Sequence, residues 1–178
     1  MSAQKAKTLE SDVLFQGRVF SVRRDRVAEP DGVIATRDVV SHPGSVVVLP
    51  VFPDGTALLV RQYRHAVDAY LWELVAGSLN PGESPAAGAR RELAEEAGYA
   101  PRGLRKLLDI FPSPGFVSER MWIFLATNLT RGVARPEEDE RITARRFSFA
   151  AIERMIRGGA IRDGKSIAGV LFYLQFVR

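Results

Sequence analysis

Apolar residues fall in short runs along the first third of the chain, and residues typical of turns separate these runs. Turn residues occupy positions 31–32, 43–44 and 52–55, and the last of these turns predicts a hairpin between its two flanking runs. Short apolar runs with such boundaries are typical of strands. The predicted strands span residues 18–27, 33–41, 45–51 and 56–63.

Helical signals appear after residue 83. Ser84 is suited to cap a helix, Pro85 to occupy its first position, and Gly98 to end it, which predicts a helix over residues 84–97. Further strands are predicted at 104–110, 121–127 and 141–147, and further helices at 149–157 and about 166–177. The expected fold class is therefore α+β, with a mixed sheet packed between helices.

Composition limits the chemistry of any metal site. The chain has 178 residues, enough for one domain with a short addition, and it has no cysteine and only two histidines, His42 and His65. Any metal must therefore be held by oxygen, which favours a hard cation such as Mg²⁺, Mn²⁺ or Ca²⁺.

The formal net charge is +4, and the basic residues are scattered, without long runs or interleaved aromatic residues. This distribution fits a solvated, arginine-rich surface or attraction to a phosphorylated small molecule, and it predicts no nucleic-acid partner. The sequence shows no apolar signal segment and no apolar stretch of membrane-spanning length. We therefore expect a cytoplasmic protein without a membrane partner.

The helix over 84–97 carries the most distinctive chemistry. Glu92, Glu95 and Glu96 share one arc of it, and their carboxylates repel one another unless a cation lies between them. The preceding loop, Gly77–Gly82, can bring backbone carbonyls close to the same cation. The alternative is a solvated acidic face that the neighbouring arginines neutralise.

Residues 77–99, GSLNPGESPAAGARRELAEEAGY, resemble the Nudix box, Gly-x5-Glu-x7-Arg-Glu-U-x-Glu-Glu-x-Gly-U, where U is a bulky apolar residue. Every position is in register, and only Tyr99 stands where an aliphatic residue is more usual. The resemblance implies the Nudix fold, a mixed β-sheet sandwiched between α-helices (α/β/α) with antiparallel N-terminal strands. It divides the chain into a flexible lead at 1–11, N-terminal strands at 12–42 that could serve in dimerisation, and a Nudix hydrolase domain at 43–178.

The resemblance also implies roles for residues of the box. Glu92 and Glu96 resemble the principal ligands of Mg²⁺, or of Mn²⁺ in its place, and Glu95 assists them. The backbone carbonyl of Ala76 resembles a further ligand. Glu83 and Arg91 resemble supports that fix the loop against the helix.

The flanking segments resemble the ADP-ribose pyrophosphatase branch of the family, over roughly residues 14–175, and Pro114 lies at the spacing from Gly98 that marks this branch. Arg64 in the segment RQYR best matches a residue that binds substrate phosphate, and Arg37 is the next candidate. Arg61 is a third candidate, and a plain surface position is the alternative for it. Glu73 is expected near the active site or in a buried ion pair. The substrate-binding residues expected from this resemblance are Arg37, Arg64, Glu73, Ser113, Pro114, Gly115 and Glu119.

A mobile loop supplies the general base in this branch. The acidic segment 135–140 has the corresponding place, although a solvated acidic turn is the plain alternative. When the strand that follows, residues 142–147, is aligned with the corresponding strand of the branch, Glu140 falls at the position of the base. If the loop aligns differently, Glu138 falls there instead. The expected catalytic residues are thus Glu140 or Glu138, together with Glu96.

The branch often forms homodimers, and aromatic side chains stack on the adenine base. Phe15, Phe20 and Tyr63 are candidates for that stacking, with core packing as the alternative for each. The expected reaction is hydrolysis of a nucleotide sugar, ADP-ribose to AMP and ribose 5-phosphate. GDP-mannose or another nucleotide sugar is the alternative substrate, and a non-catalytic ADP-ribose-binding module is the alternative class, which three intact glutamates disfavour.

The assignment of the base makes a prediction. We expect Glu140→Gln to lower turnover by a factor of about 10² or more, because the amide cannot accept the proton of the attacking water. Mg²⁺ binding should be retained, and steady-state kinetics beside a metal titration measure both quantities. Turnover close to that of the unmodified protein would move the role to Glu138 or elsewhere.

Overall fold

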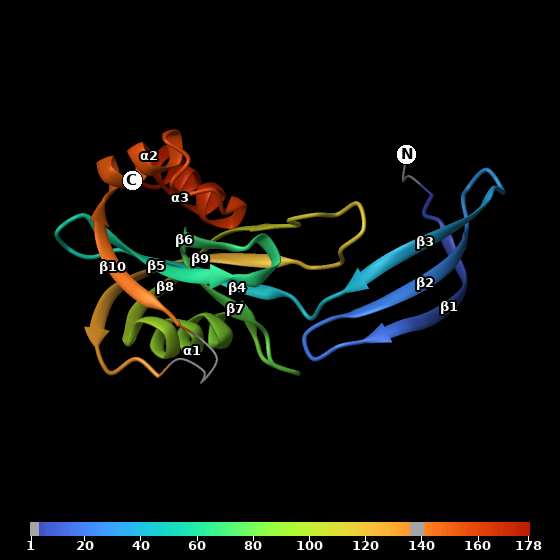
Figure 1. Cartoon of the computed structure of the whole chain (residues 1–178), viewed down its shortest axis with the longest axis horizontal. Coiled ribbons are helices and arrows are strands. Elements are labelled where there is room, and N and C mark those ends of the chain that lie inside the picture. The colour runs from blue at the N-terminus through green and yellow to red at the C-terminus, as the bar shows by residue number, and fades with distance from the viewer. Residues whose placement is uncertain (1–3, 136–140) are drawn as a thin grey trace. The chain divides into compact units, whose positions relative to one another are not determined.

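The computed structural model describes residues 4–135 and 141–178, which form two compact units. The N-terminal unit contains the residues up to Gly44 together with residues 111–120, and the main unit contains residues 45–110 and 121–178 (Figure 1). The predicted base residues, Glu138 and Glu140, lie outside the described residues.

The N-terminal unit is a three-stranded antiparallel sheet in the order β1-β2-β3. Its strands are β1 (Lys7–Gln16), β2 (Ser21–Ala28) and β3 (Ile34–Ser41). Strand β1 starts at Lys7, inside the segment that its polar composition led us to expect as a flexible lead. Pairing with β2 supplies hydrogen-bond partners to the β1 backbone whatever the side chains are, so composition alone does not reveal this strand.

Residues 111–120 are fastened to the end of β3 by backbone hydrogen bonds. The amide of Val40 donates to the carbonyl of Phe116 at 2.8 Å, and the amide of Ser118 donates to the carbonyl of Val40 at 2.9 Å. These bonds form a short parallel bridge between Val40 and Val117. The SPGF segment therefore belongs structurally to the N-terminal sheet, although two strands of the main unit flank it in sequence.

The main unit contains two sheets. The four-stranded sheet has the order β7-β4-β9-β8, with β4 and β9 parallel and the other neighbours antiparallel. Its strands are β4 (Ser45–Pro50), β7 (Val75–Ser78), β8 (Tyr99–Ile110) and β9 (Met121–Arg131). The antiparallel three-stranded sheet has the order β10-β5-β6. Its strands are β5 (Thr56–Arg64), β6 (Ala69–Glu73) and β10 (Thr143–Ser148), and a 3-10 turn, His65–Val67, joins β5 to β6.

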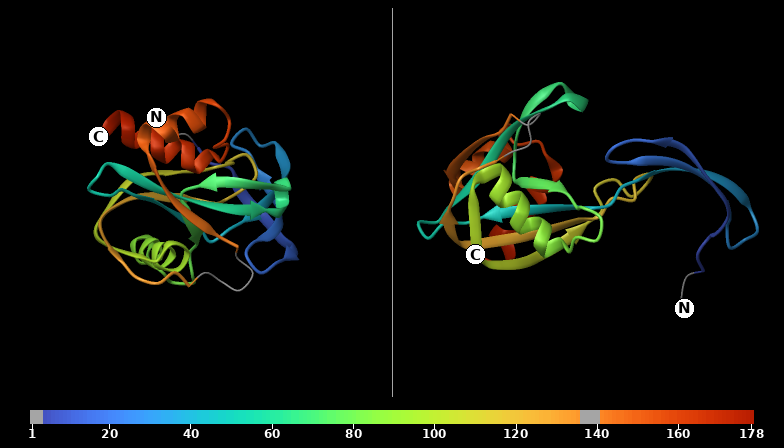
Figure 2. Two further views of the ribbon diagram at one scale, coloured as in Figure 1. Left: turned by 60° about the vertical axis from the view of Figure 1, so that its left-hand side comes forward. Right: turned by 90° about the horizontal axis from the view of Figure 1, so that it is seen from below.

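Helices cover the sheets of the main unit from two sides. Helix α1 (Pro85–Ala97) lies on one side, and helices α2 (Phe149–Arg157) and α3 (Gly164–Phe176) lie on the other (Figure 1, Figure 2). Strand β4 shows why, because its side chains alternate between two core clusters. Val46 and Val48 pack in the cluster that contains α1, whereas Val47 and Leu49 pack in the cluster that contains α2 and α3. The expected α/β/α arrangement is confirmed.

The caps of α1 form as its sequence predicts. The hydroxyl of Ser84 accepts a hydrogen bond from the amide of Ala87, and Gly98 ends the helix at a φ of 70°, which glycine adopts without strain. These two ends hold the glutamate-bearing segment in a fixed helical register. No helix of the described residues is long and apolar enough to cross a membrane.

The turn at 52–55 forms as predicted, but the hairpin around it is confined to its base. The amide of Gly55 donates to the carbonyl of Phe52, the amide of Phe52 donates to the carbonyl of Thr56, and Val51 and Ala57 form an antiparallel bridge. Beyond these contacts β4 and β5 enter different sheets. Both edges of β4 are already paired, with β7 and β9, so no edge remains for β5. Strands β6 and β7 were missed because only Leu74 separates them, so no turn residue marks the boundary between the two strands.

Candidate active site

Helix α1 buries two of the three glutamates that the sequence singled out. Glu92 is 8% exposed and Glu96 is 5% exposed, and the two lie one helical turn apart. The side chain of Glu95 is 43% exposed. A carboxylate loses hydration when it is buried, so Glu92 and Glu96 need compensating positive charge or donors.

Strand β7 passes directly against the carboxylate of Glu92. A Cβ atom added to Gly77 would lie 2.0 Å from Oε1 of Glu92, a distance that no side chain can occupy. The backbone next to Ala76 can therefore approach the carboxylate only because position 77 is glycine. The resemblance assigned a metal-ligating carbonyl to this strand, and the close approach brings its backbone and α1 together.

Arg91 connects the loop before α1 to the glutamates. Its Nε and Nη2 donate to the two carboxylate oxygens of Glu83 at 2.9 and 2.8 Å, and Nη2 also donates to the carbonyl of Ser78. Nη1 donates to Glu92 at 2.7 Å and to Glu95 at 3.0 Å. The hydrogen bonds to Glu83 contribute most to raising the pKa of Arg91, and in return they lower the pKa of Glu83. These contacts match the supporting role expected of both residues.

The residues of α1 fit a divalent cation in their chemistry. Their donors are all oxygen, two carboxylates are buried side by side, and the glycine at 77 keeps a strand backbone within reach. Oε2 of Glu96 is buried without a hydrogen-bond partner, although the residue makes other interactions. Within the described ranges no three carboxylate or imidazole groups already surround one point. Arg91 donates to one carboxylate oxygen of Glu92 and to one of Glu95.

A second charged cluster lies at the ends of β5 and β6. Arg64 donates from Nε and Nη2 to both oxygens of Glu73, each at 2.8 Å, and Glu73 is 1% exposed. Of the two roles considered for Glu73, the buried ion pair is therefore the one observed. The hydrogen bond to Glu73 is the largest contribution that raises the pKa of Arg64, and the charge of Glu96 adds to it. Of the three glutamates considered on α1, Glu96 is therefore the one that interacts electrostatically with Arg64.

Lys165 also contacts Glu73, at 2.5 Å, and sequence reasoning missed it. Burial on its own raises the pKa of Glu73, but the hydrogen bond from Arg64 and the charge of Lys165 outweigh burial, and the pKa is lowered. The segment RDGKS around Lys165 lies in a part of the chain that resembles the branch, but no local pattern distinguishes this lysine from a surface residue.

The remaining predicted residues lie in the N-terminal unit. Arg37 is exposed and pairs with Glu29 at 2.7 Å, and Glu119 lies 3.5 Å from Nδ1 of His42. The main unit carries the expected metal ligands together with Arg64 and Glu73. The loop residues in the N-terminal unit are Ser113, Pro114, Gly115 and Glu119.

The aromatic candidates for base stacking are exposed, which makes their alternative role in core packing wrong. Phe15 is 53% exposed, Phe20 is 42% and Tyr63 is 40%. The rings of Phe15 and Phe20 lie 6.0 Å apart, and the hydroxyl of Tyr63 donates to Asp68.

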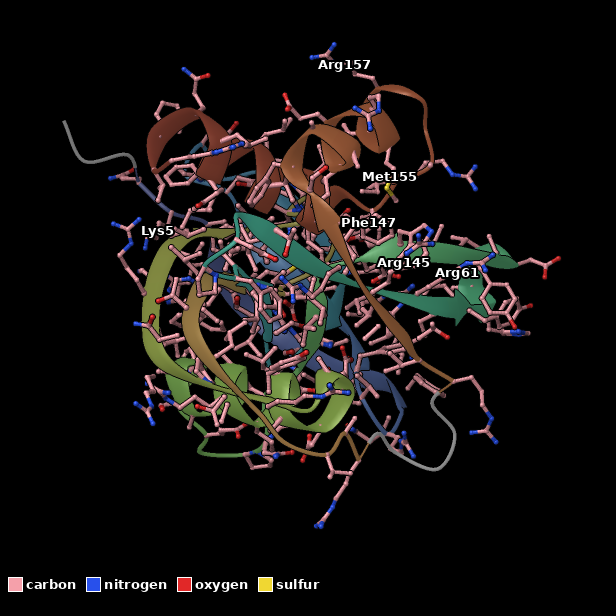
Figure 3. All side chains as sticks on the ribbon, turned by 90° about the vertical axis from the view of Figure 1, so that its left-hand side faces the viewer. Lys5, Arg61, Arg145, Phe147, Met155 and Arg157 are labelled. Atoms are coloured by element: carbon pink, nitrogen blue, oxygen red, sulfur yellow. The ribbon has the colours of Figure 1, made fainter. Side chains whose placement is uncertain are left out.

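Arg61 occupies the surface, as its alternative role predicts. Its guanidinium lies 4.9 Å from the ring centre of Tyr70. Arg61 is on the same face of the three-stranded sheet as Arg145, which lies over the ring of Phe147 (Figure 3). Arg61 therefore points to the face opposite Arg64, because neighbouring positions along this stretch of β5 alternate in direction.

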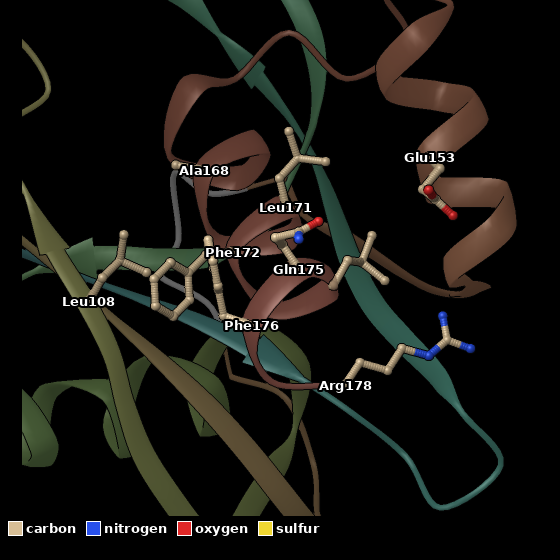
Figure 4. Close-up of a pocket in the computed structure, with 9 residues that line it drawn as sticks. Leu108, Glu153, Ala168, Leu171, Phe172, Gln175, Phe176 and Arg178 are labelled. Carbon is tan, nitrogen blue, oxygen red and sulfur yellow. The ribbon is translucent and has the colours of Figure 1, made fainter.

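A cavity of about 740 Å³ opens beside α3, away from these charged clusters (Figure 4). Most of the side chains that line it are apolar, among them Leu108, Leu171 and Phe176. It contains none of the predicted metal-binding or substrate-binding residues. The candidate active site is therefore the charged surface around α1 and Arg64.

Comparison with known proteins places this site in a family. Residues 41–169 match the NUDIX domain, and residues 7–40 match the family described as nucleoside diphosphate sugar hydrolase N-terminal domain. An α/β/α domain with a glutamate-bearing helix is the architecture of a divalent-metal hydrolase of this kind. The chain belongs to the Nudix family, as its box predicts.

Curated relatives carry names of two nucleotide-sugar pyrophosphatases. The ADP-ribose pyrophosphatase of Mycobacterium tuberculosis is 39% identical over 96% of this chain and 84% of its own length. The GDP-mannose pyrophosphatase of Salmonella paratyphi B is 36% identical over 74% of this chain and 73% of its own length. A crystal structure described as an ADP compounds hydrolase matches 99% of this chain and 96% of its own with a TM-score of 0.85 at 22% identity, which confirms the fold. The expected resemblance to the ADP-ribose pyrophosphatase branch is confirmed.

The close approach at Gly77 makes a prediction. In Gly77→Ala, the added methyl group would overlap the carboxylate of Glu92, so we expect metal affinity to fall by a factor of about 10 to 100. Titration with Mn²⁺, followed by electron paramagnetic resonance, measures this affinity without any need for turnover. Gly164→Ala is the matched control, because a Cβ atom there meets nothing within 4 Å. Equal affinity in the two variants would show that the approach at position 77 does not shape the metal site.

Proposed function

We propose that this protein hydrolyses the pyrophosphate bond of a nucleoside diphosphate sugar in a metal-dependent reaction, and that the substrate is ADP-ribose, cleaved to AMP and ribose 5-phosphate. The observation that carries the proposal is the pair of buried carboxylates of Glu92 and Glu96, together with Arg64, whose pKa the charge of Glu96 helps to raise. This arrangement combines oxygen donors for a cation with a guanidinium suited to phosphate. The similarity to the ADP-ribose pyrophosphatase of Mycobacterium tuberculosis supports the choice of substrate.

The proposed cofactor is Mg²⁺, with Mn²⁺ as a substitute. Glu92, Glu95, Glu96 and the carbonyl of Ala76 would hold it. Bound Mg²⁺ neutralises the oxygens of the pyrophosphate and makes water a better nucleophile. Arg91 would keep its two hydrogen bonds to Glu83 and so hold the loop while Glu92 and Glu95 turn toward the metal.

The remaining steps fall to residues outside α1. The carboxylates of α1 bind the metal, so another group must accept the proton of the attacking water. We assign that role to Glu140, with Glu138 as the alternative. Arg64 directs Nη1 to a phosphate oxygen, because Nε and Nη2 are engaged by Glu73. We assign further substrate contacts to Arg37, Ser113, Pro114, Gly115 and Glu119.

Two alternatives remain open to experiment. The similarity to a GDP-mannose pyrophosphatase supports a different nucleotide sugar as substrate. A module that binds ADP-ribose without cleaving it is the alternative from another class. Two buried, adjacent carboxylates disfavour that alternative, because binding a polyanion gains nothing from them.

The substrate assignment is tested with a panel. We expect Mg²⁺-dependent cleavage with the highest kcat/KM for ADP-ribose among ADP-ribose, GDP-mannose, NADH, diadenosine polyphosphates and 8-oxo-dGTP. Glu96→Gln should lower kcat for the same substrate by a factor of about 10² or more, because the metal loses a buried ligand. Strong cleavage of another member without cleavage of ADP-ribose would contradict the substrate. Binding of ADP-ribose with no cleavage in the panel would favour the binding module.

We further propose that the protein is a cytoplasmic homodimer with no nucleic-acid or membrane partner. Every residue of β1 is exposed, including Val13, Leu14 and Phe15 at 65%, 53% and 53%. A small sheet with such apolar side chains in water is marginally stable, and a second copy of the chain would cover it. The scattered basic residues support the absence of a nucleic-acid partner.

Sedimentation equilibrium tests the dimer. We expect a mass of about twice 19.7 kDa, and we expect Phe15→Glu to shift the equilibrium toward the monomer by burying a charge at the interface. Gln16→Glu, which also adds one negative charge to β1, should leave the mass unchanged. A monomeric unmodified protein at micromolar concentration would overturn the proposal.

A further inference from the structure

The start of α3 is capped by its own side chains and is fastened to the end of β6 by one buried hydrogen bond. The side chain of Asp163 caps α3 by accepting from the amide of Ser166 at 3.0 Å, and the Ser166 hydroxyl donates to the same carboxylate at 2.5 Å. That hydroxyl also accepts from the amide of Leu74 at 2.7 Å, and Ser166 is fully buried. The backbone around Lys165 is therefore held at a fixed place beside Glu73.

Four side chains of alternating charge form three successive ion pairs at this contact. Arg64 pairs with Glu73 at 2.8 Å, Glu73 with Lys165 at 2.5 Å, and Lys165 with Asp163 at 2.9 Å. The side chain of Arg64 is 39% exposed, whereas those of Glu73, Lys165 and Asp163 are 1%, 11% and 16% exposed. Arg64 alone among the four therefore has a large part of its side chain in contact with solvent.

We infer that Lys165 is a positioning residue that sets the orientation of Arg64 for the substrate phosphate by acting through Glu73. This inference rests on the proposed function, because it gives Arg64 the phosphate of a nucleotide sugar. A buried carboxylate must be matched by positive charge, and Lys165 supplies part of that charge from inside the protein. Arg64 can then contact Glu73 through one edge, Nε and Nη2, and leave Nη1 for the substrate.

Loss of Lys165 changes that balance. Arg64 becomes the single cation in contact with the buried carboxylate of Glu73, and the guanidinium is drawn toward it and away from solvent. The donor geometry that the substrate phosphate meets is then altered, while the carboxylates of α1 are untouched. The expected consequence is weaker substrate binding with little change in the chemical step, which raises KM more than it lowers kcat.

The kinetic test compares three variants. We expect Lys165→Met to raise KM for ADP-ribose about tenfold with kcat within about twofold, and Lys165→Arg to restore most of the loss, because the charge returns. Lys106→Met is the matched control, since Lys106 is half exposed and pairs only loosely, at 3.4 Å, with Asp109 on β8. A KM unchanged in Lys165→Met, or a loss confined to kcat, would overturn the inference.

A double-variant comparison separates action through Glu73 from direct contact with substrate. In the Glu73→Gln background, Lys165→Met should change KM by less than about twofold, because the carboxylate that Lys165 acts on is gone. An undiminished tenfold effect in that background would mean that Lys165 touches the substrate itself, and the positioning role would be wrong. Thermal unfolding of each variant identifies effects that arise from loss of the fold.

A readout without turnover keeps the inference separate from the proposed function. The Nε–H resonance of Arg64, identified by its loss in Arg64→Lys, reports the hydrogen bond to Glu73 in ¹⁵N spectra of the metal-free protein. We expect this resonance to shift, and its relaxation to change, in Lys165→Met but not in Lys106→Met. If the protein cleaves no member of the substrate panel, the proposed function is rejected. The comparison of Nε–H resonances still tests whether Lys165 orients Arg64. An Nε–H resonance identical in all three proteins would reject the role of Lys165.

Discussion

Burial of negative charge is the constraint on which the site depends. Helix α1 places Glu92 and Glu96 in the interior, where an unmatched carboxylate is costly. The surrounding sequence offsets that cost locally: Arg91 donates to three carboxylates and one carbonyl, and glycine at 77 lets the β7 backbone approach. Arg91 thus supplies positive charge to the buried Glu92 and ties it to Glu83 and Glu95.

Local signals in the sequence are enough to predict α1 and its chemistry. Ser84 and Gly98 mark the two ends of the helix, and the spacing of its glutamates places them on one face. What could not be predicted depends on partners far apart along the chain. Strand β1 is stabilised by its pairing with β2, and Lys165 meets Glu73 across 92 positions. The predicted hairpin stops at Val51 and Ala57 for the same reason, because β4 pairs at both edges with β7 and β9.

The division into two units separates the predicted substrate residues into two groups. The proposed cation site and Arg64 belong to the main unit, whereas Arg37 and the SPGF segment belong to the N-terminal unit. The SPGF segment is fastened to β3 through backbone atoms of Val40, and the hydroxyl of Ser118 accepts a further hydrogen bond from the amide of His42. Because backbone hydrogen bonds do not depend on residue type, the two bonds at Val40 do not by themselves constrain the side chains of Phe116 and Ser118.

The parallel pairing of β4 with β9 has a consequence for biosynthesis. Ser45 lies opposite Met121, so the central pair of the sheet joins segments 76 residues apart, with the whole glutamate-bearing helix between them. Closing so long a loop is entropically costly, and such pairings form late in folding. On the ribosome, α1 is synthesised well before β9 can cover the neighbouring edge of β4. During that interval one edge of the most buried strand is open, which makes the nascent chain most vulnerable to misassociation before its second half is complete.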